Sequence, residues 1–339
     1  MKPKIFIILI LILISVACEP VTSEAPSQKT ATVAPLTLTP VSTKTRLSST
    51  VLATATPTDI SNKLSLPDFS DLGSGQYILF KTYENGIDYL IVLSPDKRIQ
   101  RKFELDKEVG VSNDGKQLMI IQSGTEPSYI LDVTTGKWEE INLGRTCFNP
   151  SWSLDKRLIA IACFVNSYSL EIFILDTSSN SLVQITNCLE KENSCIYPAW
   201  SFDGQYLAYY RSDERSGEHP KGICVMDPIS VESDTCVSGE IGPINSDTNG
   251  VWSLDGNLIL AHDGEIRFYK PGEPEFQEIK SLDSGIDYFH SLQYSPNGEY
   301  LIFPGVGNQL YLYSFLTGMF EEMFDSHESI RIVGWVVIE

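Results

Sequence analysis

Positive charge is scarce in this chain of 339 residues, because 25 lysines and arginines stand against 44 aspartates and glutamates, a formal net charge of −19. The excess of acidic over basic residues lies after Thr58, because residues 59–339 carry 42 acidic and 20 basic side chains, a net charge of −22. A nucleic-acid partner needs a basic face to meet its phosphates, and none is visible. The charge favours instead a basic or cationic partner, bound in a salt-sensitive way.

Common signatures of catalysis and metal binding are also missing. The sequence has no G-x-S-x-G nucleophile elbow, no C-x-x-C or H-x-x-x-H spacing and no D-x-D-x-D-G calcium loop. We therefore expect no enzyme activity, no metal and no cofactor.

No apolar run is long enough to cross a membrane as a permanent helix. The run Ile5–Ile14 follows Lys2 and Lys4 and precedes Val16-Ala17-Cys18, an arrangement typical of a secretory signal peptide. It resembles the lipobox of bacterial lipoproteins, in which the cysteine becomes the lipidated first residue of the mature chain. We expect a signal peptide over residues 1–18 and a lipid anchor at Cys18 on the cell-surface or periplasmic side. Ser15 departs from the lipobox pattern, which leaves ordinary secretion or an uncleaved anchor as alternatives.

Aromatic residues and glycine are absent from the next segment, where sixteen of the forty residues 19–58 are Ser or Thr and five are Pro. Such a segment cannot bury enough apolar area to offset its conformational entropy. The composition predicts a disordered tether over residues 19–68 and a folded domain over residues 69–339.

A repeated motif predicts the fold of that domain. Its clearest copy is Pro198-Ala199-Trp200-Ser201-Phe202-Asp203-Gly204. The residues at the motif's turn position are Asp114, Asp155, Asp203, Asp255 and Asn297, spaced 41, 48, 52 and 42 apart. This is the spacing of propeller blades. Because Ser and Asp side chains bond turn backbone and Gly accepts a positive φ, these five residues are expected to be structural turn residues.

Each copy continues into further short apolar runs, which makes four antiparallel strands per repeat. At this point the sequence resembles the WD-repeat-like β-propellers of the TolB type, from about Tyr77 to Glu339. The Trp, Tyr or Val before each Ser is expected to pack between neighbouring blades. The resemblance implies an all-β binding scaffold. Only Ser295-Pro296 keeps the proline of the family motif, and Lys156 replaces the glycine after Asp155, so the tightness of single turns is open.

The ends of the domain predict how the ring closes. Residues 77–103 supply three strands without a Trp-Ser strand before them, and Ile330–Val337 is a strand without a repeat behind it. Placing the C-terminal strand innermost in the first blade would remove two exposed edges. We therefore expect six four-stranded blades, with seven as the alternative.

Six cysteines remain besides Cys18, and disulfides are the default in an exported chain. The blade geometry suggests three pairs. They are Cys147–Cys163 across one hairpin, Cys224–Cys236 across another, and Cys188–Cys195 around a short loop between blades.

We expect a monomeric, lipid-anchored binding module of the cell envelope for a protein or peptide partner, which touches the membrane only through its anchor. The resemblance implies this role. The alternative is a carbohydrate-binding or lyase-like envelope protein, and a structural surface protein is a third option. Of the four histidines (His219, His262, His290 and His327), His290 and His327 precede expected inner strands, so they mark a speculative ligand face.

Overall fold

The computed structural model describes residues 66–122, 124, 126–188, 194–212, 222–228, 234–237, 251–262, 265–271, 293–305, 308–326 and 329–339. No helix in these ranges is long and apolar enough to cross a membrane. The strands are β1 (Gly75–Glu84), β2 (Ile87–Leu93), β3 (Ile99–Glu104), β4 (Glu108–Val111), β5 (Gln117–Ile121), β6 (Ser128–Asp132), β7 (Lys137–Ile141), β8 (Cys147–Trp152), β9 (Leu158–Phe164), β10 (Leu170–Asp176), β11 (Ser181–Gln184), β12 (Ser194–Trp200), β13 (Leu207–Ser212), β14 (Gly222–Met226), β15 (Asp234–Val237), β16 (Val251–Trp252), β17 (Leu258–His262), β18 (Glu265–Tyr269), β19 (Gln293–Tyr294), β20 (Tyr300–Pro304), β21 (Gln309–Ser314), β22 (Met319–Asp325) and β23 (Ile330–Ile338).

Short apolar runs between turn residues account for these strands. The middle strands β9 and β10 read Leu-Ile-Ala-Ile-Ala-Cys-Phe and Leu-Glu-Ile-Phe-Ile-Leu-Asp, and nearly every residue in them is buried. The outer strand β11, Ser-Leu-Val-Gln, is mostly exposed. Each sheet therefore buries both faces of its middle strands and leaves its outer strand to solvent.

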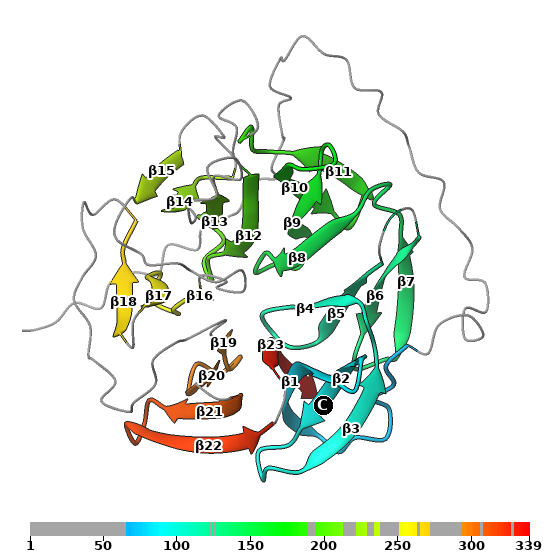
Figure 1. Cartoon of the computed structure of the whole chain (residues 1–339), viewed down its shortest axis with the longest axis vertical. Helices are drawn as coiled ribbons and strands as arrows, with labels where there is room; N and C mark the ends of the chain where they lie inside the picture. The colour runs from blue at the N-terminus through cyan, green and yellow to red at the C-terminus, as the bar shows by residue number, and fades with distance from the viewer. Residues whose placement is uncertain are drawn as a thin grey trace, which may run out of the picture. The chain divides into compact units, whose positions relative to one another are not determined.

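The sheets surround a common centre in Figure 1, with β23, β4, β8, β12, β16 and β19 innermost. Contacts join β23 to β4, β4 to β8, β8 to β12, β12 to β16 and β19 to β23. All neighbouring strands within a sheet are antiparallel. The predicted all-β propeller of four-stranded antiparallel blades is confirmed.

The predicted number of blades is wrong. Five sheets are four-stranded blades, and the sheet β16-β17-β18 has three strands among the described residues. The fourth strand that the repeat pattern predicts for this sheet would fall within residues 272–292, which lie outside the described part of the chain. Six complete blades are therefore not seen, and neither are seven.

Tryptophans at the ends of the inner strands pack between neighbouring sheets, as the motif predicts. Trp152 is 1% exposed and belongs to a cluster that includes side chains of β5 and β9, from two adjacent sheets. Trp200, Trp252 and Trp335 lie in the corresponding clusters at three other interfaces. The repeated Trp is thus a packing residue that joins one blade to the next.

The C-terminal strand closes the ring, which confirms the predicted closure. β23 is the innermost strand of the sheet β23-β1-β2-β3, and it pairs with β1 from Gly75↔Ile338 to Thr82↔Ile330. The pairing has a β-bulge between Leu79 and Phe80. The inner position that a Trp-Ser strand occupies in the other blades is filled here by the strand that carries Trp335.

The predicted turn residues form one repeated hydrogen-bond pattern. In the turn at Asp203, the Ser201 Oγ donates to the aspartate Oδ1 at 2.6 Å and accepts the main-chain N–H of Tyr206 at 2.9 Å. The same Ser-to-Asp or Ser-to-Asn bond recurs at Asp114, Asp155, Asp255 and Asn297. Gly204 takes a φ of 71°, a region that favours glycine.

Two details of these turns were not expected. Lys156 adopts a φ of 59° at the glycine position, and its turn keeps the pattern, with Ser153 bonded to Asp155. The lysine in place of glycine therefore does not loosen this turn.

A further copy of the motif stands in the first blade between β2 and β3, where Ser94 bonds to Asp96. Its Ser-Pro-Asp sequence was the signal that could have revealed it, so Ser295-Pro296 is not the only copy that keeps the proline.

Candidate functional site

One end of the propeller gathers the Ser–Asp turns, and we call it the turn face. It consists of the turns Ser112–Gly115, Ser153–Lys156, Ser201–Gly204, Ser253–Gly256 and Ser295–Gly298. Neighbouring turns touch: the Lys156 Nζ lies 2.8 Å from the Asp114 Oδ2, and the Asn113 Nδ2 donates to the main-chain oxygen of Trp152 at 3.4 Å. The hairpins between second and third strands lie at the opposite end.

A central cavity runs between the inner strands. Residues of β4, β8, β12, β16, β19 and β23 line it, and the space open to the centre of a water molecule is about 110 Å³. Two of its charged residues are paired, because Arg331 donates both terminal nitrogens to Glu108 at 2.8 and 2.9 Å. The Lys81 Nζ donates to the main-chain oxygen of Lys107 at 3.0 Å. The cavity therefore holds several waters or one extended chain end rather than a bulky ligand.

Four tryptophans contribute to the lining of this cavity, although their indole nitrogens are buried. The Trp252 Nε1 donates to the main-chain oxygen of Ala199 at 2.9 Å. The Nε1 atoms of Trp152, Trp200 and Trp335 are buried and make no hydrogen bond to the described residues.

An aromatic patch extends from the mouth of the cavity across the turn face. The patch consists of Phe202, Leu254, Tyr294, Phe315 and Leu316. The Phe202 and Tyr294 rings meet edge to face with centroids 6.5 Å apart, and the Tyr294 and Phe315 rings stack at 5.3 Å. Burial raises the pKa of the Tyr294 hydroxyl, so this group stays neutral. The patch is thus apolar and uncharged, although it lies on an acidic domain.

Three members of the patch are solvent-exposed. Leu254, Phe315 and Leu316 are 55%, 44% and 91% exposed, respectively. Phe315 and Leu316 form the tip of the β21–β22 hairpin, and Leu254 stands in the turn of the neighbouring sheet, in contact with the turn that contains Gly298. Exposed apolar side chains that adjoin in space are typical of a binding surface.

The repeated aspartates serve the turns. Burial raises the pKa of Asp114, but hydrogen bonds from Lys156, Ser112 and the main-chain N–H of Lys116 outweigh it, so the net pKa lies below the ordinary value. Asp155 and Asp203 each accept a serine hydroxyl and a main-chain N–H. One carboxylate oxygen of each residue is therefore engaged within its own turn, which is the structural role predicted for these aspartates.

The structure contains three disulfides, and their pairs are the ones suggested by the blade geometry. Cys147–Cys163 joins β8 to β9, and Cys224–Cys236 joins β14 to β15, each between directly opposite residues. Cys188–Cys195 links the end of one blade to the inner strand of the next, with a Cα–Cα distance of 5.9 Å. Disulfides of this kind fit a protein that folds outside the reducing cytoplasm.

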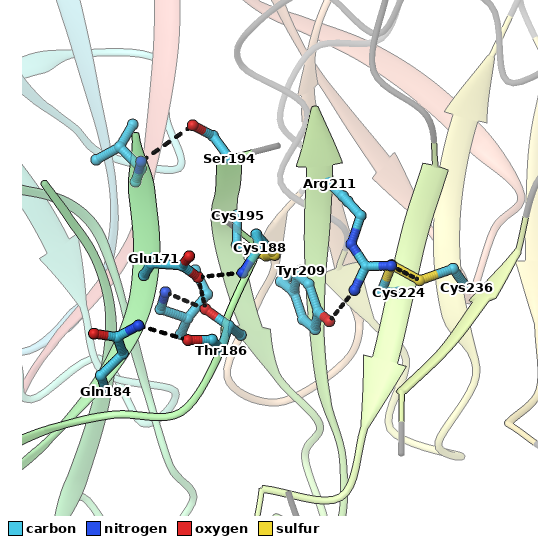
Figure 2. The surroundings of a disulfide bond; sticks show 12 residues. Glu171, Gln184, Thr186, Cys188, Ser194, Cys195, Tyr209, Arg211, Cys224 and Cys236 are labelled. Atoms are coloured by element: carbon cyan, nitrogen blue, oxygen red, sulfur yellow. Dashed lines mark hydrogen bonds between the residues drawn. A yellow bond between two sulfur atoms is a disulfide. The ribbon is translucent and has the colours of Figure 1, made fainter. Parts of the chain in front are cut away.

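A buried glutamate next to the third disulfide was not foreseen (Figure 2). Glu171 on β10 is 0% exposed and accepts the Thr186 hydroxyl at 2.5 Å and the main-chain N–H of Cys188 at 2.9 Å. Its carboxylate and the sulfurs of Cys188 and Cys195 lie within 4.8 Å of one another, the one such group in the described ranges. Since both sulfurs are joined in a disulfide, they are not the thiolates that a metal needs, and the group anchors the connection between two blades.

The ligand face predicted at His290 and His327 lies in a part of the chain that the structure does not describe. His219, His290 and His327 lie outside the described residues, as do Cys18 and most of the polar loop 212–220. His262 ends β17, where its backbone pairs with Glu265. His262 is therefore the one of the four histidines whose backbone lies in the described part of the chain.

Solved structures share this fold. The crystal structure of TolB from Acinetobacter baumannii aligns with 18% identity and a TM-score of 0.54 over 78% of this chain and 67% of that one. The putative TolB from Agrobacterium tumefaciens aligns with the same identity and TM-score over 76% and 99%. A chain of a nidogen/laminin complex aligns with 11% identity and a TM-score of 0.53 over 78% and 99%.

No protein-family model and no curated protein matches the sequence. The class that the fold defines is the β-propeller. Within that class the chain has a TolB-like β-propeller fold, as the repeated motif indicates.

Proposed function

We propose that this protein is a non-enzymatic binding module outside the cytoplasm, which holds a protein or peptide partner on its turn face. The proposed organisation is a signal peptide over residues 1–18, a tether over 19–68 and a β-propeller domain over 69–339. The molecule is monomeric, and it binds neither nucleic acid nor a cofactor.

The aromatic patch carries this proposal. Aromatic side chains concentrate binding energy in protein interfaces, and Phe202, Tyr294 and Phe315 form a continuous series of ring contacts that ends at the exposed Leu316. The net charge of −22 over residues 59–339 favours a basic partner and a salt-sensitive association rate.

Site-specific photo-crosslinking tests the binding face. A benzophenone amino acid at Leu316, on the turn face, is expected to crosslink one protein of the cell envelope, because this side chain is 91% exposed at the edge of the patch. The matched control is Tyr168, which is 80% exposed in the β9–β10 hairpin at the opposite end. Equal crosslinking at both positions, or release of a polysaccharide instead of a protein from Leu316, would contradict the proposal and favour the carbohydrate alternative.

The proposed anchor is a lipid on Cys18. The basic start, the short apolar run and Val16-Ala17-Cys18 support it. Metabolic labelling with a fatty acid is expected to mark the wild-type protein and not Cys18→Ser, which should appear in the soluble fraction. Equal labelling of both proteins would show that Cys18 is not the lipidated residue.

A further inference from the structure

The three disulfides differ in the solvent exposure of their cysteine residues. Cys147, Cys163, Cys188 and Cys195 are each at most 1% exposed. In the remaining disulfide, Cys224 is 0% exposed, whereas Cys236 is an exposed residue. Since thiol–disulfide exchange begins with attack on a sulfur atom, Cys224–Cys236 is the disulfide whose exposed cysteine an external thiol can approach.

A cation, the guanidinium of Arg211, lies beside the sulfur of Cys236. The Arg211 Nη1 lies 3.0 Å from the Cys236 Sγ, and its Nη2 donates to the Tyr209 hydroxyl at 3.1 Å (Figure 2). The guanidinium also lies 5.9 Å from the centre of the Tyr209 ring. Arg211 belongs to β13 and pairs with Gly222 on β14. Because Gly222 has no side chain, the arginine can pass over β14 to reach β15. A guanidinium at this distance stabilises a Cys236 thiolate.

The position of Cys236 in the fold makes it accessible to a large partner as well. β15 is the outer strand of the blade β12-β13-β14-β15. It is paired with β14 over four residues, and the disulfide joins the two strands at Cys224↔Cys236. The exposed Cys236 therefore lies on the rim of the propeller, and its covalent bond to Cys224 holds a short strand.

We propose that Cys224–Cys236 is a thiol–disulfide exchange site, with Cys236 as the attacked and attacking residue and Cys224 as the buried resolving residue. An external thiolate attacks the Cys236 Sγ and forms a mixed disulfide, while the Cys224 sulfur leaves and takes up a proton. A second external thiol then attacks the mixed disulfide, and the Cys236 thiolate leaves beside Arg211. Two thiols are oxidised to one disulfide, and the protein disulfide is reduced to two thiols.

Graded reduction of the full-length protein with reduced glutathione tests this site, with alkylation and peptide mapping as the readout. Cys224–Cys236 is expected to open roughly tenfold or more faster than the other two disulfides, because their sulfurs need a prior local opening. The glutathione adduct is expected on Cys236. Reduction of all three disulfides at one rate, or an adduct on Cys224, would overturn the proposal.

Arginine variants test the role of the charge in the singly reduced protein. Arg211→Gln is expected to slow alkylation of Cys236 at neutral pH roughly threefold, because a smaller thiolate fraction is partly offset by higher intrinsic nucleophilicity. Arg211→Lys keeps a charge and is expected to recover most of the rate. Arg157→Gln, which removes an arginine paired with Asp176 in another blade, is the control and should leave the rate unchanged. Equal rates in wild type and Arg211→Gln would remove Arg211 from the site.

Discussion

A chain that ends at Ser329 is expected to lose the cooperative unfolding transition of the propeller. The deletion removes β23, and with it the inner strand of the first blade and its ladder to β1. Ile332, Trp335 and Val336 are 4%, 5% and 0% exposed and belong to two different core clusters. At roughly 1.5–3 kcal/mol for each buried apolar side chain, their loss is comparable to the whole stability of a domain.

Far- and near-ultraviolet circular dichroism with thermal unfolding measures this effect. The truncated protein is expected to show no sharp transition, and a synthetic peptide of residues 330–339 should restore one. The matched control deletes only Glu339, which forms an exposed ion pair with Lys116. An unchanged melting temperature in the longer deletion would mean that β23 does not close the ring.

Substitution of Gly115 by Ala is expected to be far more damaging than the same change at Gly204. Both glycines stand in the Ser–Asp turn with nearly equal φ angles, 72° and 71°. A Cβ at Gly115 would lie 2.8 Å from the main-chain oxygen of Trp335 and 2.8 Å from the Val337 Cγ2, both in the closing strand. A Cβ at Gly204 meets nothing within 4 Å. The difference between the two variants therefore isolates the contact with β23.

Denaturant unfolding of the two variants gives the free energies. Gly204→Ala is expected to cost about 1–2 kcal/mol, the strain of a left-handed conformation with a Cβ. Gly115→Ala is expected to cost a further 1–3 kcal/mol, because backbone must move and the bond from the Val337 N–H to the Gly115 carbonyl, 2.9 Å long, is disturbed. Equal losses would show that the turn tolerates a side chain against β23.

The repeated turns were predictable because their chemistry is local. Ser201 and Asp203 are two residues apart, so the bond between them depends on the turn itself and recurs wherever the pair recurs. Short-range chemistry also explains the disulfides Cys147–Cys163 and Cys224–Cys236, which face each other across hairpins. The copy at Ser94 and Asp96 was missed because it stands on a different hairpin of its blade, outside the regular spacing.

The binding surface was not predictable in the same way. Phe202 comes from a different repeat than Tyr294 and Phe315, and only the arrangement of the blades around the ring brings the Phe202 and Tyr294 rings into contact. Arg211 and Cys236 are 25 residues apart, and their contact depends on two strand pairings and on the missing side chain of Gly222. No periodicity in the sequence marks either arrangement.

By itself, the sequence therefore determined the all-β class, the repeating turn and the closing strand, because each follows from hydrophobic pattern and side chains close in the chain. Only the tertiary structure decided the number of complete blades, the aromatic patch, the buried environment of Glu171 and the exposure of Cys236. These features depend on which distant segments share a face, and in a ring of blades that choice is made by packing between repeats.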